Sequence, residues 1–170
     1  MSYEEDLKIE KFTESDFEFY FKLVGNAKVM AMITERALSE DEAKDEFSKI
    51  VLNNELHSFL GTYKITGSSS NNFIGFVKLT IQKPNDTEAE LGYMLLPEYW
   101  GKGIAGVMAR NMIKRSRSLD QLTRIKAIID PNNIPSKKIL LNSGFSSVRF
   151  VDFDGLPGEI LELQLNRPLD

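Results

Sequence analysis

The stretch Leu91–Gly106, LGYMLLPEYWGKGIAG, decides the fold more than any other part of this chain. It begins as an apolar strand, stops at Pro97 and continues through a glycine-rich turn that opens a helix. A turn of this kind leaves several main-chain N–H groups pointing at one place, at the positive end of the helix dipole. Glycine at 101, 103 and 106 lets a bulky ligand approach the main chain closely. The stretch therefore predicts a site for an anionic group such as a pyrophosphate.

Two familiar phosphate-binding loops do not fit this stretch. A P-loop requires a serine or threonine after Gly-Lys, but Gly103 follows Lys102. A dinucleotide-binding loop has the spacing G-x-G-x-x-G and an acidic residue about 20 positions later. The three glycines match that spacing, but the chain continues there as Gln121–Arg124, with only Asp120 nearby and no second βαβ half. The context therefore argues against a nicotinamide cofactor.

The residues around the loop carry a family resemblance. Ala89–Tyr93 and Pro97–Ala105 resemble motif A of the GNAT N-acetyltransferases, whose pyrophosphate loop is usually written Q/R-x-x-G-x-G/A. Trp100 stands at the Gln/Arg position, and tryptophan there is familiar in the Rim-type branch, which acetylates the N-termini of ribosomal proteins. Asn133–Phe145 resembles the second signature of the superfamily, N-x-x-S followed by a short helix that ends in G-F. The two motifs, in this order, imply an acetyl-CoA-dependent N-acetyltransferase.

Composition sets bounds on the class of protein. The 170 residues are 42% hydrophobic, which fits one globular domain over residues 1–170. The absence of cysteine excludes a disulfide framework, a thiolate zinc site and a cysteine nucleophile. The net charge of −4 disfavours nucleic acid as a partner. Neither a membrane-spanning run nor a basic leader is visible, and Met1–Asp6 is acidic, so we expect a cytoplasmic protein without membrane association.

The pattern of apolar residues predicts an α/β protein with the element order βααβββαβαββ. The expected strands are 7–12, 59–65, 73–82, 88–95, 125–129, 145–152 and 159–165. Two helices should begin at capping boxes that start with Ser15 and Ser39, a third should follow Gly103, and a fourth should cover 135–142. The apolar-rich run 125–129 predicts a buried central strand. The resemblance implies the same order, a mixed and mostly antiparallel GNAT sheet of about seven strands with four helices.

The resemblance also implies how acetyl-CoA is held as cosubstrate. The cofactor-binding residues would be Met94, Leu95, Leu96, Gly101, Lys102, Gly103, Ile104, Ala105, Gly106, Asn133 and Lys138. Main-chain groups of 94–96 would pair with the pantetheine amides where the strand splays from its neighbour, and the amides of 101–106 would hold the pyrophosphate. Asn133 would bind the pantetheine arm, and Lys138, with Lys137, would meet the 3′-phosphate. The alternatives are a tight turn without ligand, a helix N-cap at Asn133 and two solvent-exposed lysines.

Acetyl transfer by direct attack requires a base for the amine and stabilisation of the departing thiolate. Glu90 lies on the strand that delivers the cofactor, where many family members place the general base, and alternation could point its carboxylate into the acceptor cleft. Its alternative is a structural acid that pairs with a neighbouring strand. The tyrosine that usually serves as general acid is replaced by Leu140.

In the Rim-type branch other residues would take these roles. A serine at the position of Ser136 would donate to the thiolate, although Ser136 could equally be a plain helix-start hydroxyl. An acid just after the sixth strand, Asp152 or Asp154, would replace the carboxylate of Glu90. The single histidine, His57, is expected to be structural or exposed, and no metal is expected.

The acceptor stays open at this point. It would be a primary amine, either a protein N-terminal α-amine or a small molecule, bound between the first two helices, the loop 31–38 and the last hairpin. A non-catalytic CoA-binding module is the alternative from another class, and the missing tyrosine at 140 supports it. The protein would be a monomer or a homodimer.

Overall fold

The computed structural model describes Tyr3 and residues 5–165, which form one seven-stranded sheet in the order β1-β2-β3-β4-β5-β7-β6. The strands are β1 (Leu7–Lys11), β2 (Gly61–Gly67), β3 (Phe73–Thr80), β4 (Glu88–Leu95), β5 (Arg124–Ile129), β6 (Ser146–Phe153) and β7 (Leu156–Gln164). Neighbouring strands are antiparallel except for β4 and β5, which are parallel. The mixed, mostly antiparallel sheet is therefore confirmed.

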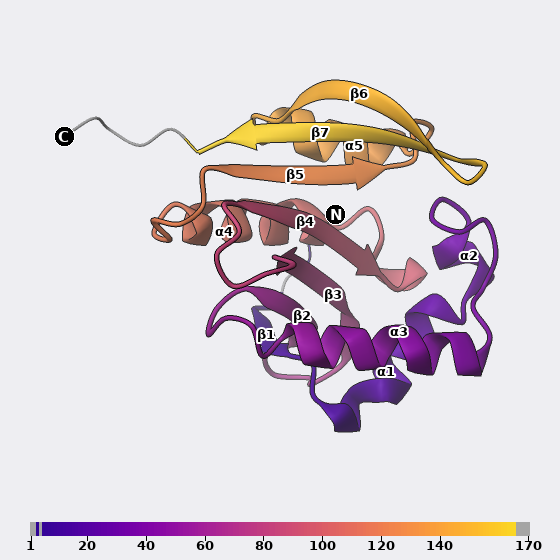
Figure 1. Ribbon diagram of the computed structural model, residues 1–170. Helices are drawn as coiled ribbons and strands as arrows, with labels where there is room; N and C mark the ends of the chain where they lie inside the picture. Colours follow the sequence, from indigo (N-terminus) through magenta and orange to yellow (C-terminus); the bar gives the residue numbers. More distant parts are fainter. Residues whose placement is uncertain (1–2, 4, 166–170) are drawn as a thin grey trace.

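Helices cover both faces of this sheet (Figure 1). They are α1 (Phe17–Val24), α2 (Ala27–Met30), α3 (Glu40–Asn53), α4 (Ile104–Ser116) and α5 (Ile134–Asn142), with short 3₁₀ helices η1 (Glu14–Asp16) and η2 (Pro97–Tyr99). Helices α1 to α3 pack on β3 in one apolar cluster, and α4 and α5 belong to a second cluster on the other face.

The number and start of the helices differ from the prediction. The prediction of four helices is wrong, since the described residues contain the additional α2, whose first turn is capped by the Asn26 side chain accepting from Lys28 N at 2.9 Å. Four residues are too few to show a helical period, so the sequence pattern did not reveal it. The box expected to start with Ser15 is shifted, because Asp16 Oδ2 accepts instead from Thr13 N at 2.9 Å and α1 begins at Phe17.

The second capping box is confirmed. Ser39 Oγ accepts from Glu42 N at 3.2 Å, and Glu42 Oε1 accepts from Ser39 N at 3.0 Å. These reciprocal bonds satisfy two N–H groups that a helix start leaves without partners. They fix the start of α3 and so the orientation of the helix face that overlies the sheet.

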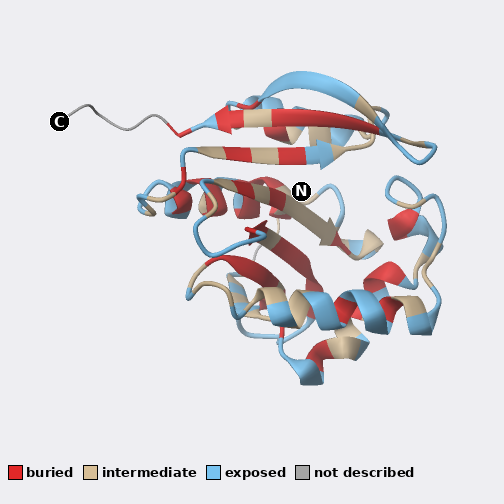
Figure 2. Cartoon of the chain, viewed as in Figure 1, coloured by how far each residue is buried: buried red, intermediate tan, exposed pale blue. Residues whose placement is uncertain are grey.

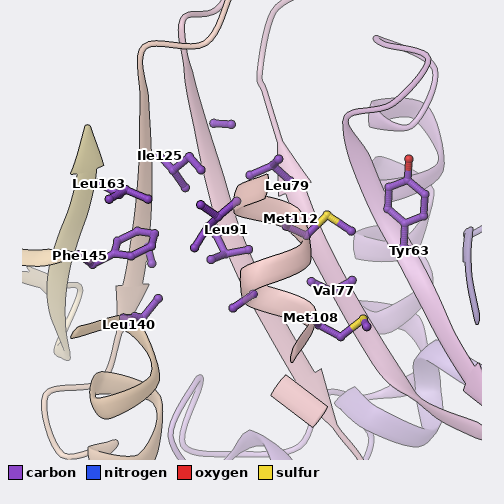
Figure 3. Packing of buried hydrophobic residues seen from close by; sticks show 14 of the residues in the cluster. Tyr63, Val77, Leu79, Leu91, Met108, Met112, Ile125, Leu140, Phe145 and Leu163 are labelled. Carbon is purple, nitrogen blue, oxygen red and sulfur yellow. The ribbon is translucent and has the colours of Figure 1, made fainter. Parts of the chain in front are cut away.

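The larger core lies between the sheet and α4 (Figure 3). Met108 and Met112 of α4 are almost wholly buried, as are Leu79, Leu91 and Ile125 of the sheet. Strand β5 is central, as expected, but it is not buried along its whole length: Ile125 and Ala127 face the core, whereas Ile128 is 37% exposed. The reason is that α1 to α3 pack on β3 and leave β5 without a covering helix on that face (Figures 1 and 2).

No helix within the described part of the chain has both the length and the apolar character needed to cross a membrane.

Candidate active site

The sheet opens between β4 and β5. The two strands pair only from Glu88–Arg124 to Glu90–Lys126, although β4 continues to Leu95 and β5 to Ile129. Figure 1 shows the strands diverging toward their C-terminal ends. Beyond Glu90, the described residues of β4 therefore have no strand partner on the β5 side.

Strand alternation decides which main-chain groups of β4 face this opening. Leu96 N donates to Ile74 O of the β3 side at 2.9 Å, so the main-chain groups of Leu96 and Met94 point toward β3. The groups of Tyr93 and Leu95 then point into the opening. Of the three residues predicted to bind pantetheine through the main chain, only Leu95 has this direction, and Tyr93 is a neighbour that the prediction missed.

Trp100 joins the end of β4 to the glycine loop. Its indole N–H donates to Leu95 O at 2.9 Å, while the ring is 44% exposed and lies 5.4 Å from Lys28 Nζ. The tryptophan thus binds back to the strand that precedes the loop. This contact fixes the start of the loop relative to the opening.

The loop 101–106 has the geometry of an anion cradle. Gly101 and Gly103 have φ angles of 74° and 81°, in the left-handed region that favours glycine, and a Cβ on either would meet nothing within 4 Å. The space a side chain would fill is therefore free for a ligand. Helix α4 begins at Ile104, and its i−4 ladder starts with Val107 N donating to Gly103 O at 3.1 Å. The amides of Ile104, Ala105 and Gly106 precede that ladder and have no helical acceptor, so the residues present fit a diphosphate.

Helix α5 begins on the other side of the opening. Asn133 is its N-cap, as the structural alternative predicted, with Oδ1 accepting from Ser136 N at 3.3 Å, which leaves its amide N–H groups for a ligand. Tyr93 reaches across the opening, and its hydroxyl donates to Ser136 O at 3.4 Å. Burial raises the pKa of Tyr93, an effect only partly offset by this hydrogen bond, so the phenol stays protonated.

The two lysines of α5 have different surroundings. Lys137 Nζ lies 3.0 Å from Glu159 Oε2, and the Glu159 side chain is 0% exposed, so Lys137 serves as the counter-ion of a buried carboxylate. Lys138 is exposed. Of this pair, Lys138 is therefore the one whose side chain can turn toward a ligand.

Glu90 faces a cleft of about 720 Å³ that is lined by residues of α1, α2, α3, β3 and β4. Its carboxylate accepts a hydrogen bond from Lys78 Nζ at 3.0 Å, and both side chains are partly buried. The stem of Lys78 lies over Gly92, where an added Cβ would come within 2.7 Å of it. Met94 lines the same cleft and belongs to the unpaired part of β4, so the cleft and the opening meet there.

The lining of the cleft agrees in part with the predicted acceptor pocket. Residues from α1, α2, α3 and the loop 31–38 contribute, including three carboxylates of α3 at Glu42, Asp45 and Glu46. Glu42 is paired with Arg36 and Glu46 with Lys49. None of the described residues that line it comes from the last hairpin.

Asp152 and Ser136 do not join Glu90 in this cleft. Asp152 Oδ1 accepts from Gly155 N at 2.5 Å and so closes the tight β6–β7 turn, where Asp154 and Gly155 have positive φ. Asp152 pairs with Pro157, and alternation places it on the same face as Glu159, opposite to Glu90. His57 is structural, because its Nδ1 accepts from Phe59 N at 2.9 Å and Leu60 N at 3.0 Å.

Sequence reasoning missed Lys78 and Tyr93. Alternation along β4 could have assigned Tyr93 to the face opposite Glu90. No local signal identifies Lys78 as the partner of Glu90, since that pairing depends on the register of β3 against β4.

A sheet opened between two parallel strands, with an anion cradle at the end of one of them, suits a long ligand with a diphosphate group. The family model for the acetyltransferase (GNAT) domain matches residues 6–146. The chain belongs to this family.

One individual relative agrees with this assignment. An uncharacterized N-acetyltransferase p20 from Bacillus licheniformis is 26% identical over 104 residues, which is 61% of this chain and 58% of the relative. The chain thus spans less than two thirds of that protein's length.

Three solved structures have the same fold. A GNAT-family acetyltransferase from Bacillus anthracis is 19% identical, with 97% of this chain and 99% of that chain covered and a TM-score of 0.77. Spermidine N-acetyltransferase from Vibrio cholerae, in complex with CoA and spermine, is 19% identical over 94% and 95% of the two chains, with a TM-score of 0.75. RimL, a ribosomal L7/L12 α-N-protein acetyltransferase in complex with coenzyme A, is 15% identical over 93% of each chain, also with a TM-score of 0.75.

Proposed function

We propose that the protein transfers an acetyl group from acetyl-CoA to a primary amine. The observation that carries this proposal is the junction at Met94, where the opening between β4 and β5 meets a cleft lined by Glu90. The glycine loop lies at the end of the same strand, so a ligand with a diphosphate and an extended arm is held along β4 with its far end at the cleft. Residues 1–170 act together as one catalytic domain in this proposal.

The chain offers distinct groups for each part of coenzyme A. The amides of 101–106 hold the diphosphate, including those of Lys102, Ile104 and Ala105. The main-chain groups of Tyr93 and the N–H of Leu95, whose carbonyl already accepts from Trp100, bind the pantetheine amides, and the side-chain amide of Asn133 supports the same arm. Lys138 pairs with the 3′-phosphate. Met94 and Leu96 contribute through their side chains, because their main-chain groups face β3.

Glu90 is the general base in this proposal. Acetyl-CoA supplies a thioester whose carbonyl carbon the amine attacks, so that a C–N bond forms as the C–S bond breaks. Glu90 takes the proton that the ammonium must lose, directly or through a water. Its position in the cleft supports this role.

Two hydroxyl groups are candidates to donate a proton to the sulfur. Ser136 is in the first turn of α5, and the Tyr93 hydroxyl from β4 donates to the main-chain oxygen of Ser136. Both residues therefore lie beside the opening between β4 and β5. The raised pKa of Tyr93 keeps its proton available at neutral pH. Asp152, whose carboxylate closes a turn on the other face, serves a structural role in this scheme.

The acceptor is a protein N-terminal α-amine or a small cationic amine. A cleft of about 720 Å³ accommodates either. RimL and spermidine N-acetyltransferase, two proteins of this fold, act on one class each.

Release of thiol tests the function directly. The chain has no cysteine, so every thiol detected with a disulfide reagent comes from CoA. We expect release with at least one member of a panel of N-terminal peptides and small amines, and a loss of about 100-fold or more in kcat for Glu90→Gln. Asp152→Asn is the matched carboxylate-to-amide control and should remain active. Tight binding of CoA without release from any amine would instead identify a CoA-binding module.

A further inference from the structure

The residues that precede β1 lie against the glycine loop. Tyr3 N donates to Lys102 O at 3.1 Å, and the Tyr3 ring packs edge-on against Tyr99 with 6.0 Å between ring centres. Tyr3 therefore contacts both the loop and the η2 turn just before it. The hydrogen bond from Tyr3 N to Lys102 O joins two main-chain groups, and its acceptor belongs to the predicted diphosphate cradle.

The same segment is fixed at its other end. Glu5 Oε1 accepts from the main-chain N–H groups of Ser69 and Ser70, each at 2.6 Å, in the loop between β2 and β3. Tyr3 OH donates to Glu5 Oε2 at 2.9 Å, and Asp6 O accepts from Ser68 N at 2.8 Å. These bonds hold Tyr3, Glu5 and Asp6 between two loops that are about 30 positions apart in the chain.

The bond to Lys102 fixes one peptide unit. In a planar trans peptide the carbonyl and the following N–H point in opposite directions, so an oxygen of Lys102 that faces Tyr3 makes the N–H of Gly103 face away from it. Gly103, at a φ of 81°, has no side chain that would prevent this peptide from flipping. A Cβ on Gly103 would meet nothing within 4 Å, so a ligand has room to approach the loop at this residue.

We propose that Tyr3 is a positioning residue for the cofactor: its main-chain N–H orients the Lys102–Gly103 peptide so that the Gly103 amide faces the diphosphate of CoA. The proposal rests on the function proposed above, since it assumes that the loop holds that diphosphate. It predicts an effect on binding of CoA and none on ligands that lack the diphosphate.

A pair of substitutions at one position isolates the main-chain bond. Tyr3→Ala removes the ring and keeps the N–H, whereas Tyr3→Pro removes the ring and the N–H together. Dissociation constants for CoA and for pantetheine, which has no diphosphate, are measured by calorimetry or by the fluorescence of Trp100, the one tryptophan of the chain. We expect Tyr3→Pro to bind CoA about five- to tenfold more weakly than Tyr3→Ala, the effect of one hydrogen bond, with equal pantetheine affinities.

Two results would overturn the proposal. Equal CoA affinities of Tyr3→Pro and Tyr3→Ala would show that the bond does not orient the loop. An equal loss for CoA and pantetheine would show a general disturbance of the fold. If the wild-type protein itself does not prefer CoA to pantetheine, the loop does not hold the diphosphate, and the proposed function then fails independently of the role of Tyr3.

Glu5→Ala provides a second measurement if Tyr3→Pro does not fold. It frees the other end of the segment and leaves Tyr3 and the loop unchanged in sequence. We expect a smaller loss of CoA affinity, about two- to threefold, and again no change for pantetheine. An unchanged CoA affinity in Glu5→Ala, with wild-type thermal stability, would also count against the proposal.

Discussion

Replacement of Lys137 by methionine should destabilise the protein strongly, although Lys137 is on the surface helix α5. Its partner Glu159 lies on β7 with a side chain that is 0% exposed, and the two charged groups are 3.0 Å apart. Both carboxylate oxygens are buried, and the Lys137 ammonium is their counter-ion. Without Lys137, a buried carboxylate would lose its counter-ion.

The expected cost follows from this burial. Removing one partner of a buried ion pair costs about 3–5 kcal/mol, and the lower end applies because the Lys137 side chain is 33% exposed. For a domain of this size, about 3 kcal/mol corresponds to a fall of about 6–12 °C in Tm. Glu159→Gln removes the charge but keeps the shape, so we expect it to cost only about 1 kcal/mol.

Urea denaturation of the two single variants and the double variant measures the coupling. Lys137→Met with Glu159→Gln should be about as stable as Glu159→Gln alone, since no charge is then left buried. Lys138→Met is the matched control on the same helix and should change the free energy of unfolding by less than about 0.5 kcal/mol. A cost below about 0.5 kcal/mol for Lys137→Met would refute the reasoning.

The pH dependence provides a further check on this pair. Burial acts to raise the pKa of Glu159, but the Ser147 side chain and the Lys137 ammonium outweigh it, and the pKa lies below its ordinary value. A lowered folded-state pKa contributes stability above the unfolded value, and that contribution is lost as the pH falls through the folded value. The part of the Lys137→Met deficit that comes from this lowered pKa should therefore shrink on acidification below pH 4.5.

Three other predictions concern the cofactor site and its supports. Gly103→Ala should cost about 1–2 kcal/mol of stability, because residue 103 has a left-handed φ. It should also weaken CoA binding in a fluorescence titration by at least about tenfold, because the new Cβ occupies the cradle. An unchanged affinity for CoA would exclude the loop as the binding site. Lys138→Gln should reduce the preference for CoA over dephospho-CoA, which lacks the 3′-phosphate, by about three- to fivefold in calorimetry, and a preserved preference would assign the phosphate to another residue. The amide of Ser70 and the other donors around Glu5 lower the pKa of Glu5 from 4.5 to about 2. The stabilisation from Glu5 is therefore present above pH 4.5 and is lost as the pH falls toward 2, so the melting temperatures of the wild type and Glu5→Gln should converge over that range. A difference in melting temperature that stays constant with pH would contradict this prediction.

Local features of this protein were determined by the sequence itself. The left-handed glycines at 101 and 103, the capping box of Ser39 and Glu42, and the N-cap at Asn133 involve residues within a few positions of one another. Their conformations depend on steric limits and hydrogen bonds that a short segment makes alone. The alternation of apolar residues likewise fixed the order of the strands and of the longer helices, although not the four-residue α2.

Pairings between distant segments were decided only by the tertiary structure. Strand register brings Lys78 to Glu90, the docking of α5 on β7 brings Lys137 to Glu159, and the path of the N-terminal segment brings Tyr3 to Lys102. Each of these contacts depends on how whole elements pack. The sequence contains many lysines and carboxylates, so it does not identify which of them pair. The face of the sheet is the clearest case: Glu90 and Asp152 are both strand carboxylates, and only the pairing of the strands places one in the cleft and the other in a turn on the opposite side.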